Sequence, residues 1–130
     1  MQCAGCMTDK ADALKERTKQ FALDVLVFVR TLPREEPASS IRRQLARAGT
    51  SVGANYRAAC RARSRAEFAA RIGVVLEEAD ESLFWLEIVE EDRLSAGDML
   101  NHLLAQAREL TAIFAASSIT TRAALDGDRR

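Results

Sequence analysis

Residues 41–59 read Ile41-Arg-Arg-Gln-Leu-Ala-Arg-Ala-Gly-Thr-Ser-Val-Gly-Ala-Asn-Tyr-Arg-Ala-Ala59. Apolar side chains recur at intervals of three and four residues, with arginines in many of the positions between them. That interval is the period of an α-helix with one side turned toward a core. We therefore predict an amphipathic helix over residues 40–62, with Ser39 or Ser40 as its N-cap. Its core-facing residues are Ile41, Leu45, Ala48, Val52, Tyr56 and Ala59.

Three more segments have the same period. Pro33 should end the first, because proline lacks the amide hydrogen that a helix interior requires. Ser64 and Glu67 have the Ser-x-x-Glu spacing of a capping box and should open the third helix. Ser95, three residues before Asp98, should cap the fourth. We place these three helices at residues 9–32, 65–91 and 96–122.

Four helices joined by short connections favour an all-α fold, a single antiparallel four-helix bundle running up-down-up-down over residues 9–122. The tails at residues 1–8 and 123–130 are expected to be flexible. The inward-facing residues expected on the other three helices are Leu14, Phe21, Val25, Phe28, Leu32, Phe68, Ile72, Val75, Ala79, Leu83, Leu86, Met99, Leu103, Leu110, Ile113 and Phe114.

The composition agrees with a soluble, cytoplasmic protein. Of the 130 residues 48% are hydrophobic and 29% charged, and the formal net charge is zero, so no overall field draws the chain to nucleic acid or membrane. No apolar run approaches the roughly 18 residues that a membrane-spanning helix needs. The N-terminus lacks the charged and apolar regions of a signal peptide, which predicts that the protein stays in the cytoplasm without membrane contact.

The cysteine pattern indicates a reducing compartment. Cys3, Cys6 and Cys60 are an odd number in a chain without an export signal, which argues against a disulfide framework. Cys3 and Cys6 form an isolated CxxC pair, whereas a structural zinc site needs four ligands and the chain has one histidine, His102. We interpret the pair as free thiols in a mobile tail, and we predict no metal and no cofactor.

Several apolar residues fall on the wrong side of their helices. Leu23 and Val27 lie opposite the core stripe of the first helix, and Phe84 and Ile88 lie opposite that of the third, with Trp85 to one side. An exposed apolar patch usually marks an interaction surface, which predicts self-assembly. The alternative is that the core stripes of these two helices are simply wide.

Charge is divided unevenly along the chain. Residues 39–71 hold eight arginines and one acid, whereas residues 72–98 hold nine acids and one base. Copies with one basic and one acidic face could pair head to tail, and such a contact closes into a ring if the angle allows. In the alternative reading the two segments are neighbours in one bundle and neutralise each other.

Three motifs support a resemblance to a known family. They are Gln44-Leu-Ala-Arg-Ala-Gly-Thr-Ser51-Val-Gly-Ala-Asn55-Tyr-Arg, then Arg63-Ser-Arg-Ala-Glu67-Phe68, then Glu78-Ala-Asp-Glu81-Ser-Leu-Phe-Trp85-Leu-Glu. Over about residues 14–115 the chain resembles the four-helix-bundle family named after the 23S ribosomal RNA intervening-sequence protein. The resemblance implies a homopentameric ring of undefined activity. A related branch resembles the accessory subunit of diversity-generating retroelements, which binds nucleic acid and a reverse transcriptase.

Arginines on the second helix are candidates for nucleic-acid binding. Arg43, Arg47, Arg57 and Arg61 fall within about 80° of one another, opposite the core stripe, and could contact RNA or DNA phosphates. No aromatic side chain is interleaved to stack on bases. A charged stripe opposite a core is also what any soluble helix shows. The full candidate set is Arg43, Arg47, Arg57, Arg61, Arg63 and Arg65.

Asn55, with Ser51 one turn before it, lies at the edge of the core stripe. A buried Asn must be hydrogen-bonded and often fixes helix register, so we favour a structural role over a pocket-lining one. Ser64 and Glu67 are read as a cap.

The chain offers little for catalysis. Glu77, Glu78 and Glu81 invite comparison with di-iron bundles, but those sites need two Glu-x-x-His pairs, and one histidine cannot supply them. We therefore predict a non-enzymatic, ring-forming binding module. Its expected partners are its own copies and possibly RNA or DNA. The alternatives are a protein-only scaffold and, less favoured, a carboxylate metalloenzyme.

Overall fold

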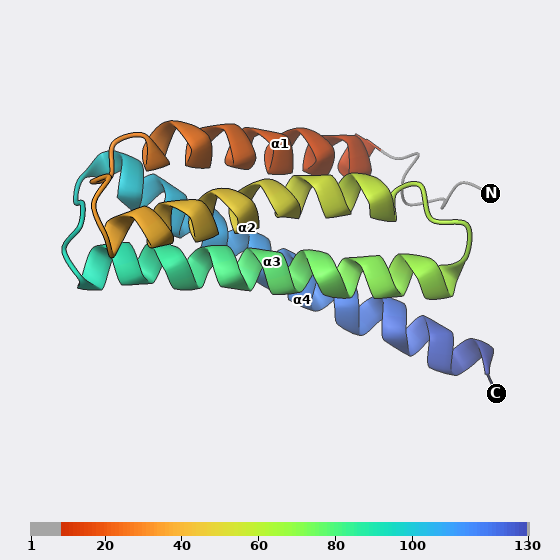
Figure 1. The fold of residues 1–130 in the computed structure, drawn as a ribbon. Helices are drawn as coiled ribbons and strands as arrows, with labels where there is room; N and C mark the ends of the chain where they lie inside the picture. The colour runs from red at the N-terminus through yellow and green to blue at the C-terminus, as the bar shows by residue number, and fades with distance from the viewer. Residues whose placement is uncertain (1–8, 130) are drawn as a thin grey trace.

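The computed structural model describes residues 9–129, and these form four α-helices and no strand. The helices alternate in direction along one axis, so the chain runs up-down-up-down (Figure 1). The predicted all-helical, four-helix architecture is confirmed. The helices are α1 (Asp9–Val29), α2 (Ala38–Ala59), α3 (Arg65–Glu91) and α4 (Asp98–Asp128).

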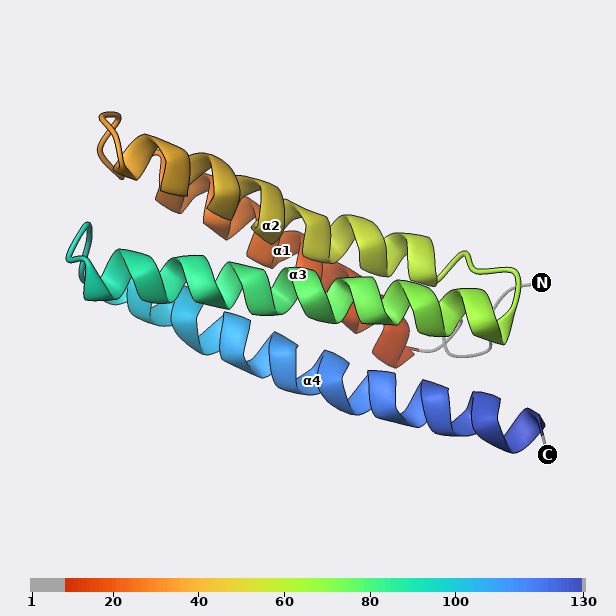
Figure 2. The same ribbon diagram turned by 60° about the horizontal axis from the view of Figure 1, so that its bottom comes forward.

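Neighbouring helices in the chain are neighbours in the bundle. α2 packs against α1 and α3, and α3 packs against α2 and α4, whereas α1 and α4 approach each other over a much shorter length. Among the described residues α1 makes no close backbone approach to α3, so these two helices are diagonal. Figures 1 and 2 show the C-terminal half of α4 diverging from α1. The described polar contacts between α1 and α4 accordingly lie between residues 17–24 and 102–109.

The core is built largely from the side chains that the periodicity selected. Phe21, Leu45, Ile72 and Phe114 are among its largest fully buried members. Leu14, Phe68, Leu83 and Ile113, also expected inside, are only half-buried.

Met99 was wrongly expected in the core: it is 43% exposed, whereas Leu100 is 2% exposed. Adjacent helical residues point about 100° apart, and Leu100 is the one aligned with the buried Leu103, Leu104 and Ala107.

Two predicted N-caps are wrong. α2 begins at Ala38 with Pro37 at the N-cap, and neither Ser39 nor Ser40 caps it. Instead, the Ser40 hydroxyl donates to the Glu36 carboxylate (2.5 Å). This hydrogen bond, helped by the Arg43 guanidinium, lowers the pKa of Glu36 below its ordinary value.

Ser95 does not cap α4, because the helix begins only at Asp98. Gly97 occupies the N-cap position with φ of 122°, a left-handed conformation that interrupts the helical path after Ser95. At its other end α4 continues to Asp128 instead of fading near Arg122, so residues 123–128 are helical and not a tail. An ion pair between Arg65 of α3 and Asp128 (2.8 Å) holds this last turn.

The remaining boundaries follow the predictions more closely. α3 spans the predicted residues 65–91, α1 ends at Val29 before the predicted Leu32, and α2 begins and ends a few residues early. The Ser64 hydroxyl accepts a hydrogen bond from the Glu67 amide (3.1 Å), which confirms the cap. The Glu67 carboxylate accepts from the amide of Arg63 (2.9 Å), so the reciprocal bond goes one residue further back than in the standard capping box. The predicted tail at residues 1–8, with Cys3 and Cys6, lies outside the described residues.

The end of α3 is closed by a Schellman motif. The amide of Leu94 donates to the carbonyl of Val89 (3.0 Å), and the amide of Arg93 donates to that of Glu90 (3.1 Å). The motif requires a left-handed residue, and Arg93 fills that position with φ of 56°. A side chain there costs about 1 kcal/mol or more relative to glycine.

We therefore expect Arg93→Gly to raise the free energy of unfolding by about 1 kcal/mol, because glycine adopts this conformation without a Cβ clash. Urea denaturation followed by circular dichroism would measure the gain. Arg93→Ala is the matched control: it removes the same charge but keeps the Cβ atom, so it should give no such gain. Equal effects of Gly and Ala would contradict the backbone explanation.

Candidate interaction surfaces

Two apolar patches are exposed on the described part of the chain, one on α1 and one on α3. On α1, Leu23 is 48% and Val27 is 46% exposed. On α3, Phe84 is 50% exposed and its ring meets that of Trp85 edge to face (5.0 Å between centroids), while Trp85 and Ile88 are half-buried. Both patches lie on the side of their helix turned away from the core. Because α1 and α3 are diagonal, the patches lie on opposite sides of the bundle.

Charged residues flank each patch at the same spacing. On α1 the order is Lys19, Leu23, Val27 and Arg30; on α3 it is Asp80, Phe84, Ile88 and Glu91. Each series has its second, third and fourth members four, eight and eleven residues after the first. That spacing keeps them on one side of a helix. The four charged residues are exposed and have no ion pair within residues 9–129. The two patches therefore match in pattern and are opposite in charge.

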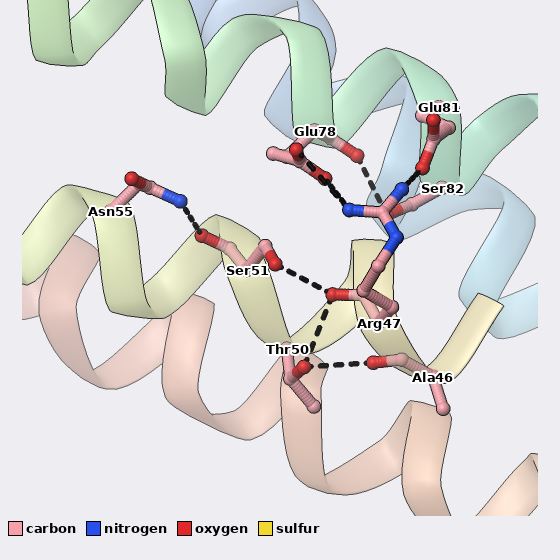
Figure 3. Close-up of polar contacts among 8 residues, drawn as sticks. All are labelled: Ala46, Arg47, Thr50, Ser51, Asn55, Glu78, Glu81 and Ser82. Carbon is pink, nitrogen blue, oxygen red and sulfur yellow. Dashed lines mark hydrogen bonds and ion pairs between the residues drawn. The ribbon is translucent and has the colours of Figure 1, made fainter. Parts of the chain in front are cut away.

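Several predicted nucleic-acid-binding arginines have partners inside the bundle. Arg47 pairs with Glu78 (3.2 Å) and with Glu81, and Figure 3 shows its guanidinium between the two carboxylates. Arg43 donates to the Ser39 hydroxyl (2.8 Å). Arg43 also approaches Glu36, and Arg65 pairs with Asp128. The Arg47 contacts neutralise part of the opposite charges of α2 and α3 within one subunit.

Three of the predicted arginines remain available at the surface. Arg57, Arg61 and Arg63 are exposed, and none of them has an ion pair within the described part of the chain. Arg57 and Arg61 lie one turn apart, near the C-terminal end of α2. The usable positive charge of the predicted arginine ridge is therefore concentrated at that end of the helix.

Ser51 and Asn55 lie between α2 and α3. The Ser51 hydroxyl donates to the Arg47 carbonyl (2.7 Å), and the Asn55 side-chain amide donates to the Ser51 carbonyl (2.9 Å; Figure 3). The side-chain oxygen of Asn55 accepts from Arg71 of α3 (3.4 Å). These contacts link the two helices, as a register-fixing residue would.

A basic groove runs between α1 and α2, and its positive side chains come partly from a helix that the sequence reading did not consider. It has a volume of about 350 Å³. Lys15 and Lys19 line it from α1, and Arg57 lines it from α2. The signal that could have found the lysines is their four-residue spacing beside the α1 core stripe. The other lining residues are Ala22, Thr50, Gly53 and Ala54.

The carboxylates considered for metal binding are dispersed or paired. Glu77 is exposed, whereas Glu78 and Glu81 contact Arg47. Within residues 9–129 no three His, Cys, Asp or Glu side chains are close enough to share a metal ion. Cys60 is buried in the core. None of the helices in the described part of the chain is both long and apolar enough to span a bilayer.

Comparison with known proteins agrees with this architecture. The chain is similar to a crystallised protein of unknown function from the S23 ribosomal protein family of Bacteroides thetaiotaomicron. The TM-score is 0.73 and the sequence identity 27%, with 80% of this chain and 96% of that chain covered. No curated protein matches the sequence. The family model described as 23S rRNA-intervening sequence protein matches residues 12–116. Because this match covers most of the bundle, the chain belongs to the 23S rRNA-intervening sequence protein family.

Proposed function

We propose that this protein is a non-enzymatic, cytoplasmic assembly module whose copies associate side by side into a ring and present that ring to a macromolecular partner. The observation that carries the proposal is the matched pair of patches on α1 and α3. The α1 face of one copy would pack on the α3 face of the next, covering Leu23 and Val27 with Phe84 and Ile88.

Charge complementarity supports this pairing. Lys19 and Arg30 flank the α1 patch at both ends, and Asp80 and Glu91 flank the α3 patch at both ends. Opposite charges therefore meet whether the two helices dock parallel or antiparallel. Complementary rim charges favour correct pairing and disfavour contacts between identical faces.

The position of the patches favours a ring over a two-fold dimer. A contact between different surfaces of two copies leaves one surface of each kind unoccupied, so association continues until it closes. The resemblance to pentameric relatives suggests closure at five subunits, or about five times the 14.3 kDa subunit mass. A protein-only scaffold would use the same ring to dock another protein.

The test is a charge-swap series measured by light scattering after size exclusion. We expect the wild type to have a fixed multiple of the subunit mass. Lys19→Glu with Arg30→Glu should dissociate it, because like charges then meet across the contact, and so should Asp80→Lys with Glu91→Lys. All four substitutions together should restore the assembly, since opposite charges face each other again.

Ile119→Ser is the matched control for the patches, because Ile119 is 71% exposed but lies on α4, outside both of them. It should leave the mass unchanged. A wild-type monomer at every concentration would overturn the proposed assembly. Dissociation in both double variants without recovery in the quadruple variant would show that these faces do not pair.

Nucleic-acid binding is a second proposed function. It is supported by the exposed Arg57 and Arg61 and by the basic groove beside them, which concentrate positive charge in a chain whose net charge is zero.

A further inference from the structure

We infer that the groove between α1 and α2 binds the backbone phosphates of nucleic acid without reading its sequence, an inference that rests on nucleic-acid binding as a proposed function. Lys15 and Lys19 form one wall of this groove, and Arg57 lies on the other. Amine and guanidinium groups converging from two helices match an anionic ligand.

The groove has no carboxylate among its lining residues. Two other grooves of similar volume differ: the one between α1 and α4 includes Glu16 and Asp24, and the one between α3 and α4 includes Asp126. Positive charge in the α1–α2 groove is therefore the least neutralised by its own walls.

The three cations differ in how far they are occupied. Lys15 pairs with Asp12 (3.2 Å), whose side chain is 65% exposed. Such a solvent-exposed pair contributes at most about 1 kcal/mol and can exchange for a phosphate. Lys19 and Arg57 are exposed and have no ion pair among residues 9–129. All three cations can therefore reach a ligand.

The floor of the groove is formed by a close approach of the two helix backbones. A Cβ atom on Gly53 would lie 3.2 Å from the carbonyl oxygen of Thr18. The hydroxyl of Thr50 already donates to the carbonyl of Ala46 (2.8 Å). Backbone amides inside helices are also engaged, so the lysine and arginine side chains are the donors left for a ligand.

The small side chains of the groove limit what it can recognise. Ala22, Gly53 and Ala54 offer neither an aromatic face for base stacking nor an amide for base-edge hydrogen bonds. Phosphate contacts position a nucleic acid but carry no sequence information. Arg61, one helical turn beyond Arg57, extends the basic surface along α2. The groove therefore fits a strand that crosses it through its phosphates.

The experiment measures binding of a fluorescein-labelled, single-stranded RNA of mixed sequence by fluorescence anisotropy, over a series of salt concentrations. We expect Lys15→Gln with Arg57→Gln to weaken binding about tenfold at low salt and to reduce the salt slope by about two, one for each lost phosphate contact. A single-stranded DNA of the same sequence should behave alike. Both variants keep Lys19, so the proposed contact between subunits is untouched, and light scattering should give the wild-type mass.

Arg108→Gln with Arg129→Gln is the matched control. It removes two exposed arginines of α4 and its end that are outside the basic groove, and it should change neither the affinity nor the salt slope. An equal loss in this control would show that only net charge matters, and would overturn the groove as the site.

The remaining outcomes separate the site from the function. RNA binding that is lost in Arg43→Gln with Arg61→Gln but kept in the groove variant would place the site elsewhere on α2 and leave nucleic-acid binding intact. No RNA or DNA binding by the wild type at low salt would overturn both. If inorganic phosphate displaces the RNA at an equal phosphate concentration, the groove is a site for small anions and the inference is wrong.

Discussion

Phe114→Ala should lower the free energy of unfolding by about 3–5 kcal/mol, the range for truncating a buried phenylalanine. Phe114 is 1% exposed, and its ring meets that of Tyr56 at 5.4 Å between centroids. It joins α4 to the diagonal helix α2 at the level where α4 begins to diverge from α1. The truncation therefore removes packing where the bundle has little α1–α4 contact to compensate.

Urea denaturation at one fixed protein concentration would measure this loss, since subunit association raises apparent stability with concentration. Ile119→Ala on the same helix is the control, because Ile119 is 71% exposed and its truncation should change stability by no more than about 0.5 kcal/mol. Comparable losses from both substitutions would contradict the assignment of Phe114 to the core.

Gly49→Ala should destabilise the protein by about 1–2 kcal/mol, although alanine is the better helix former. A Cβ atom on Gly49 would lie 2.9 Å from both γ-carbons of Val25, a β-branched residue with 0% exposure and little rotamer freedom. Overpacking of this kind typically costs about 1–3 kcal/mol, and the gain in helix propensity of up to about 1 kcal/mol offsets only part of it. The same unfolding measurement tests the prediction.

Gly73→Ala is the matched control and should have the opposite sign. The nearest atom to a Cβ at Gly73 is a guanidinium nitrogen of Arg122, 3.8 Å away, so helix propensity should dominate and stability should rise by about 0.5–1 kcal/mol. Val25→Ala should relieve the clash, so the Val25→Ala, Gly49→Ala double variant should lose less than the sum of the two single variants. Strict additivity would show that Val25 is not the obstacle.

The candidate surfaces were predictable in part. Leu23, Val27 and Phe84 are exposed as the helical period indicated, because the angle between a side chain and its own core stripe is a local property. The candidate arginines were found as well, but not their partners: the contacts of Arg47 with Glu78 and of Arg65 with Asp128 join residues distant in sequence. For the same reason Lys15 and Lys19 were not connected with Arg57, although all three line one groove.

By itself the sequence determined the number of helices, their alternating direction and most of the core. Each of these follows from a repeat of 3.6 residues and from local stop signals such as the Ser64–Glu67 cap. Only the tertiary structure decided that α4 continues to Asp128, that α1 and α3 are diagonal, and that Gly49 packs on Val25. These features depend on which helices meet and how closely, and that is settled by side-chain packing between segments distant along the chain, which no local period encodes.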